Sequence, residues 1–115
     1  MPKRTLGVYG GASCGGCDLA VLEIGDALGR LSDAFDIVFW PEIADFKYAD
    51  VERMADGAID VCLFNGAVRT EENRELAELL RRVSKTLVAF GACASFGGIP
   101  GLANLFSRAE LLACV

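Results

Sequence analysis

A doubly wound α/β fold, in which helices cover both faces of a parallel sheet, is predicted by two patterns in this sequence. Short apolar runs alternate with helical patterns along the 115 residues. The runs are largely apolar and do not alternate with polar residues, which is typical of parallel strands covered on both faces. Right-handed crossovers between such strands then give a flavodoxin-like, three-layer arrangement.

Four strands are expected, all parallel and in the spatial order 2-1-3-4. Their ranges are 5–9, 36–40, 59–64 and 86–90. Each run is ended by glycine, proline or an Asn-Gly pair, namely Gly10, Pro41, Asn65-Gly66 and Gly91. Folds of this kind usually have a fifth strand, but the sequence ends too soon after the fourth to form one. We therefore expect this chain to lack the last strand.

The expected helices fill the segments between these strands. Residues at helical spacing predict one continuous helix through Val21, Ile24, Leu28 and Leu31. Residues 49–56 predict a short helix, and Thr70 is a typical N-cap for the next one. That helix has a buried stripe made of Leu76, Leu79, Leu80 and Val83. Residues 97–101 are expected to form a fixed loop, and the last helix starts after Ser107 and runs back across the sheet.

The composition excludes several classes of function. The chain has 11 basic and 16 acidic residues, a net charge of −5, which argues against a nucleic-acid binder. It has no histidine, which excludes Ser-His-Asp triads and zinc sites of the Cys/His type. No stretch is long enough for a membrane span, and the amino terminus does not resemble a signal peptide. We therefore expect a cytoplasmic protein, in which closely spaced cysteines serve metal binding or redox chemistry.

Three cysteines follow two of the expected strands. Cys14 and Cys17 come after the first strand, and Cys93 comes after the fourth. Because parallel strands present their carboxyl ends at one edge of the sheet, these three thiols can converge there. Glycines that permit close backbone approach flank the thiols and are candidate cofactor-binding residues, namely Gly15, Gly16, Gly97 and Gly98. Such a thiol set suits an iron–sulfur cluster.

The same residues also fit other interpretations. A C-x-x-C pair at the start of a helix is also where thioredoxin-like proteins carry their redox-active cysteines. A third interpretation is that the cysteines are purely structural. Cys62 lies inside an apolar run and is expected to be a small buried hydrophobe, whereas Cys114 is either an incidental thiol or a ligand.

Three residues near these motifs are expected to have structural roles. Asp18 and Glu23 are expected to be carboxylates on the helix surface or at an interface, and Trp40 is expected to pack in the interior. The glycine-rich segments match neither a dinucleotide fingerprint nor a phosphate-binding loop.

A set of motifs resembles one known family over nearly the whole chain. The segments are Cys14–Asp18, Asp36–Pro41, Asp45–Lys47, Leu63–Arg69 and Ala89–Leu105. They resemble the small, iron–sulfur subunit of nickel–iron hydrogenases and its relative, the 20 kDa subunit of NADH:ubiquinone oxidoreductase. The branch that they resemble most is the iron–sulfur subunit of methyl-viologen-reducing hydrogenase.

The resemblance implies a ligand set and a partner. In that family this flavodoxin-like domain holds the proximal 4Fe–4S cluster beside the nickel–iron large subunit, and Cys14, Cys17 and Cys93 match three of its four ligand positions. The family's fourth ligand lies in a Gly-Cys-Pro motif that this sequence does not contain, so the fourth ligand is not identified. Residues 1–115 are therefore expected to be a single iron–sulfur domain that is C-terminally truncated relative to the family.

The functional expectation is an electron-transfer subunit of a hydrogenase-type oxidoreductase that is not catalytic alone. The large subunit should dock on the edge formed by loops 10–17, 65–70 and 91–101, and further electron-transfer subunits, such as one resembling heterodisulfide reductase, should join the complex. A thiol–disulfide oxidoreductase that uses Cys14 and Cys17 is the alternative. A cluster-free structural or assembly subunit is the third candidate.

Overall fold

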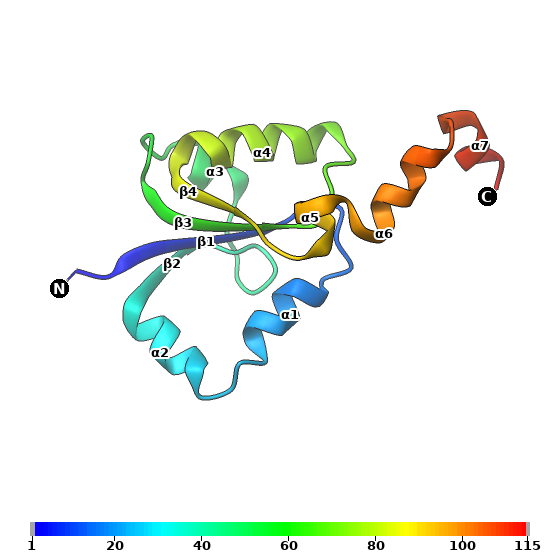
Figure 1. The fold of residues 1–115 in the computed structure, drawn as a ribbon. Coiled ribbons are helices and arrows are strands. Elements are labelled where there is room, and N and C mark those ends of the chain that lie inside the picture. The colour runs from blue at the N-terminus through cyan, green and yellow to red at the C-terminus, as the bar shows by residue number, and fades with distance from the viewer. Residues whose placement is uncertain (1, 115) are drawn as a thin grey trace.

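The computed structural model describes residues 2–114 and contains a four-stranded parallel sheet (Figure 1). The strands are β1 (Arg4–Gly10), β2 (Phe35–Phe39), β3 (Ile59–Asn65) and β4 (Ser84–Ala89). Their order in the sheet is β2-β1-β3-β4, which confirms the predicted topology. Val8 of β1 pairs with Leu63 of β3, and Leu63 pairs with Val88 of β4, so the three strands end at the same edge.

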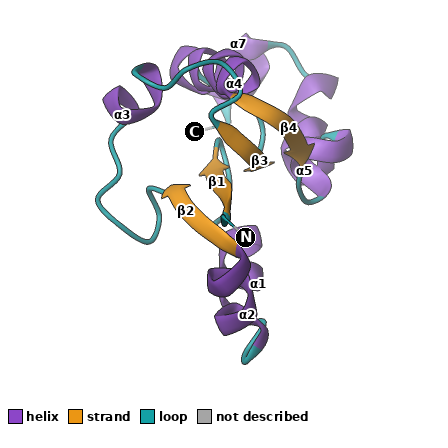
Figure 2. Ribbon diagram, turned by 90° about the vertical axis from the view of Figure 1, so that its left-hand side faces the viewer, coloured by secondary structure: helices purple, strands orange, loops and turns teal. Residues whose placement is uncertain are grey.

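Helices cover both faces of the sheet, as the doubly wound prediction requires (Figure 2). On one face lie α1 (Gly16–Leu22) and α2 (Ala27–Ala34), and on the other lie α3 (Tyr48–Glu52) and α4 (Glu71–Val83). Each face has its own core. Beneath α3 and α4 the core is the larger one and contains Tyr9, Phe39, Val51, Ile59, Cys62, Phe64, Leu76, Leu80 and Val83. On the α1 and α2 side the core is built on Leu6, Val8 and Trp40.

The first helical segment is two helices, so the prediction of one continuous helix was wrong. The α1 helix ends at Leu22 and α2 begins at Ala27. Between them Gly25 has a φ of 62°, a left-handed conformation that stops a helix and that glycine adopts without steric cost. The apolar spacing continues across this break, because both helices turn apolar residues toward the same face of the sheet.

The predicted cap of α4 is confirmed. The Thr70 hydroxyl accepts a hydrogen bond from the Asn73 backbone N–H at 3.1 Å, and the Asn73 side chain accepts one from the Thr70 N–H at 3.2 Å. Ser107 caps α7 (Arg108–Ala113) in the same way through the Glu110 N–H. These caps satisfy backbone donors that the first turn of a helix leaves free.

The segment after β4 departs from the predicted loop. It forms α5 (Ala92–Phe96), α6 (Gly98–Gly101) and a 3₁₀ turn, η1 (Leu102–Leu105), so residues 97–101 are largely helical. Together with α7 these elements extend away from the carboxyl edge of the sheet, and α7 does not run back across it (Figure 1). Within residues 2–114, no helix has the length and apolar character needed to cross a membrane.

Candidate functional site

The loops that follow β1 and β3 are joined by backbone hydrogen bonds at the carboxyl edge of the sheet. The Ala12 N–H donates to the Ala67 carbonyl at 2.8 Å, and the Ala67 N–H donates to the Ala12 carbonyl at 2.9 Å. Gly11 makes this approach possible, because a Cβ there would lie 2.6 Å from the Ala67 carbonyl oxygen. The loop that carries Cys14 is therefore fixed against the end of β3 before α1 begins.

Cys17 lies against the loop that carries Cys93. A Cβ on Gly91 would stand 2.5 Å from the Cys17 Sγ, so the thiol occupies space that only glycine leaves free. Gly91 also has a φ of 86°, which favours glycine. Cys93 follows two residues later in the first turn of α5. The thiol of Cys14 accepts a hydrogen bond from the Gly16 N–H at 3.4 Å.

The surroundings of Cys17 disfavour its thiolate form. Burial raises the pKa of Cys17 above its usual value, and the charges of Cys14, Cys93 and Asp18 raise it further. A raised pKa keeps Cys17 protonated at neutral pH, which is unfavourable for a thiol nucleophile. An iron cluster reverses this, because bound metal carries the positive charge that stabilises thiolates.

The three cysteines differ in exposure and do not together form a site for a single metal ion. Within residues 2–114, no three cysteine, histidine or acidic side chains stand close enough together to hold a single metal ion. Cys14 is exposed, whereas Cys17 in α1 and Cys93 in α5 are half-buried.

The two remaining cysteines lie outside this group. Cys62 is fully buried in β3, as predicted, and burial raises its pKa to about 11. Cys114 is exposed at the end of α7, where its thiol donates to the Glu110 carbonyl at 3.3 Å.

Asp18 is a buried residue, so its assignment to the helix surface or an interface was wrong. Its carboxyl accepts a hydrogen bond from Trp40 Nε1 at 2.8 Å and one from Asn65 Nδ2 at 3.3 Å. Ser13 extends the network by donating to Asn65 Oδ1 at 2.7 Å. Trp40 is buried, as predicted. Sequence reasoning missed Asn65 and Ser13; the signal available for Asn65 was an amide that ends a largely apolar strand.

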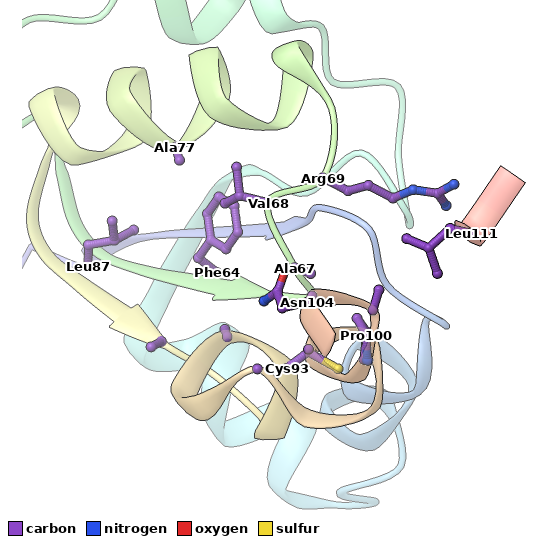
Figure 3. Close-up of a pocket in the computed structure, with 16 residues that line it drawn as sticks. Phe64, Ala67, Val68, Arg69, Ala77, Leu87, Cys93, Pro100, Asn104 and Leu111 are labelled. Atoms are coloured by element: carbon purple, nitrogen blue, oxygen red, sulfur yellow. The ribbon is translucent and has the colours of Figure 1, made fainter. Parts of the chain in front are cut away.

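A cavity of about 670 Å³ opens beside the Cys93 loop (Figure 3). Its walls come from the end of β3, from β4 and α4, and from the segment after β4. The labelled lining residues include Phe64, Val68, Leu87, Cys93, Pro100 and Leu111. The lining is mainly apolar, with the Arg69 side chain at one side.

Comparison with known proteins identifies the family. The family model described as "NADH ubiquinone oxidoreductase, 20 Kd subunit" matches residues 14–113. The chain belongs to this family. Similar curated proteins include the iron-sulfur subunit of the F420-non-reducing hydrogenase of Archaeoglobus profundus, which is 48% identical over 85% of this chain and 31% of that protein.

Two further relatives agree with the family assignment. A vhu subunit of the F420-non-reducing hydrogenase of Methanocaldococcus jannaschii is 40% identical over 86% of this chain and 32% of its own length. A crystal structure of NAD+-reducing NiFe hydrogenase in the H2-reduced state superposes with a TM-score of 0.82 at 28% identity, covering 97% of this chain and 58% of that one. The chain thus spans about a third of the length of these curated relatives.

Proposed function

We propose that this chain is the iron–sulfur, electron-transfer subunit of a nickel–iron hydrogenase-type complex. The observation that carries the proposal is the contact of Cys17 with Gly91, which joins the Cys14–Cys17 loop to the Cys93 loop. The relative that is named as a hydrogenase iron-sulfur subunit supports the same role. Residues 1–115 would then act as a single cluster-binding domain that is not catalytic alone.

Cys14, Cys17 and Cys93 would hold three corners of a 4Fe–4S cluster, and the fourth ligand is not identified in this chain. When bound, such a cluster accepts and releases one electron. The chain's own residues prepare the site. Cys17 lies against Gly91 of the segment that carries Cys93, and both Cys17 and Cys93 are half-buried, which limits solvent at the site.

Four glycines would let the backbone approach the cluster closely. Gly15 has a φ of 82° and nothing within 4 Å of an added Cβ, so the chain turns there in open space. Gly16 directs its N–H at the Cys14 sulfur. Gly97 and Gly98 also have positive φ values, and a Cβ on Gly98 would lie 3.1 Å from the Cys93 nitrogen. The backbone therefore contacts sulfur at Gly16 and packs closely against the backbone of Cys93 at Gly98.

A nickel–iron large subunit is the proposed partner on this edge. The segment after β4 exposes a run of large apolar side chains, which is typical of a surface covered in a complex. They are Phe96, Ile99, Leu102, Leu105 and Phe106, with Phe96 80% and Ile99 83% exposed. Further electron-transfer subunits, such as a heterodisulfide reductase-like protein, would take the electron onward. The five free thiols suit a reducing, cytoplasmic compartment.

Anaerobic purification followed by absorption and electron paramagnetic resonance spectroscopy tests the proposal. We expect a broad visible band that is lost on reduction, together with a spin signal in the reduced state. A colourless protein with a dithiol that titrates reversibly would instead establish a thiol–disulfide oxidoreductase.

A further inference from the structure

Asp18 joins three parts of the fold directly behind the cysteine pair. It lies in the first turn of α1, next to Cys17. One carboxyl oxygen accepts from Trp40 Nε1 at 2.8 Å, just after β2, and the other accepts from Asn65 Nδ2 at 3.3 Å, at the end of β3. Only 4% of Asp18 is exposed, so these bonds replace water around the carboxyl.

The same network reaches the residue that precedes Cys14. Ser13 donates to Asn65 Oδ1 at 2.7 Å, and the Gly15 N–H donates to Ser13 Oγ at 3.1 Å. Asn65 also donates to the Tyr9 carbonyl at 3.2 Å, which attaches the network to β1. The loop is therefore bonded to the sheet on both sides of Cys14.

Gly10 leaves room for the side chains of Asn65 and Asp18. A Cβ on Gly10 would lie 3.3 Å from Asn65 Oδ1 and 3.4 Å from Asp18 Oδ2, tighter than an ordinary contact. Among residues 2–114, Asp18 takes part in none of the ion pairs. Both of its partners are neutral N–H donors, so its acceptor oxygens are satisfied while its charge has no cation against it.

We propose that Asp18 is a positioning residue that fixes the Cys14–Cys17 loop to β2 and β3, and that its negative charge lowers the reduction potential of a cluster held there. The inference rests on the proposed function for its second half only. An uncompensated carboxylate next to a ligand opposes the addition of an electron, because the low-dielectric interior screens that charge weakly.

Two variants and one control separate these roles in the full chain, which is used cluster-free in the first measurement and purified anaerobically with any bound subunits for the second. Asp18→Asn keeps the shape but removes the charge and turns an N–H donor toward one of its two donor neighbours. Trp40→Phe removes one donor and leaves the charge. Glu23→Gln is the control, because Glu23 is an exposed acid at the other end of the same helix.

The first measurement is amide hydrogen exchange across residues 13–18 in cluster-free protein. We expect exchange to be at least about tenfold faster in Asp18→Asn and in Trp40→Phe, because a lost hydrogen bond to a charged group destabilises the closed loop. Glu23→Gln should exchange like the wild type. Wild-type exchange in both network variants would overturn the positioning role, whether or not any cluster assembles.

The second measurement is the midpoint potential of the cluster, followed by electron paramagnetic resonance. Asp18→Asn should shift it to a more positive value, whereas Trp40→Phe should shift it less and Glu23→Gln not at all. A purely structural role for Asp18 predicts an unchanged potential, and that result would overturn the electrostatic half. A wild-type protein that never holds a cluster would refute the proposed function and this half together, and the exchange result would still decide the positioning half.

Discussion

Gly91 leaves the space that the thiol of Cys17 occupies, because a Cβ on residue 91 would stand 2.5 Å from the Cys17 Sγ. The two residues lie in different parts of the chain, because Cys17 is in the first turn of α1 and Gly91 follows β4 as the N-cap of α5. Their contact brings the carboxyl end of β4 against the cysteine pair. A side chain introduced at Gly91 should therefore disturb this contact directly.

Gly91→Ala should destabilise the fold and lower cluster content. Residue 91 has a φ of 86° and a ψ of 171°, a region essentially restricted to glycine, so alanine should cost about 1–3 kcal/mol before any clash is counted. Urea unfolding and visible absorbance measure the two effects. Gly101→Ala is the matched control, because Gly101 has a φ of −63° and open space around an added Cβ. Equal stability of the two variants would contradict the prediction.

Serine replacements should separate the proposed ligands from the other cysteines. Cys14→Ser or Cys93→Ser should abolish the visible band of the anaerobically purified chain, because a hydroxyl is a poor iron ligand in place of a thiolate. Cys62→Ala and Cys114→Ser should keep it, since these side chains lie in the core and at the end of α7. Loss of the band in Cys114→Ser alone would show that Cys114 is the fourth ligand.

Asp60 should make stability depend on acid pH. Hydrogen bonds from Lys85 and Thr5 lower the pKa of Asp60 from its ordinary value of 3.8 to about 2 in the folded chain. A lowered folded pKa stabilises the fold at pH values above 3.8, and this contribution is lost as the pH falls toward 2. Urea midpoints of the wild type and Asp60→Asn should therefore differ at about pH 6 and converge near pH 2. A difference that is constant across this range would contradict the assignment.

Asn73→Ala should destabilise the attachment of α4 to β1. Asn73 accepts from the backbone N–H groups of Arg69 and Thr70 at 3.2 Å and donates to the Tyr9 hydroxyl at 3.2 Å. Removing the amide leaves buried groups unpaired, which should lower the free energy of unfolding by about 1–3 kcal/mol. Glu75→Ala, at an exposed position on the same helix, should change it by less than about 0.5 kcal/mol.

The positions of the strands were predictable because their sequence signals are local, and their order was predictable from a general rule of topology. Each apolar run is stopped by a residue that ends a strand, and the right-handed crossover rule then limits the topology. The break at Gly25 was not predictable from periodicity, since apolar residues recur at helical spacing in the sequence on both sides of it. Residues 97–101 have the glycine and proline content of a loop, yet Pro100 is tolerated within the first turn of a short helix.

The meeting of the cysteine loops followed from topology, because parallel strands end at one edge. The environment of Asp18 did not follow from the sequence. A carboxylate in the first turn of a helix usually faces water, and only the tertiary structure brings Trp40 and Asn65 to it. Asn65 and Gly66 together have the sequence of a turn, although the Asn65 side chain points inward and is fully buried.

The burial of Cys62 gives the chain an internal chemical reporter. Cys62 is fully buried, and burial raises its pKa to about 11. In the folded, cluster-free chain a thiol-specific reagent therefore cannot reach the sulfur, and the sulfur is not in its reactive thiolate form. The other four cysteines are half-buried or exposed. The fifth equivalent of label, which reacts with Cys62, should therefore be incorporated only as fast as molecules unfold. The labelling rate of Cys62 then measures the rate at which the sheet opens.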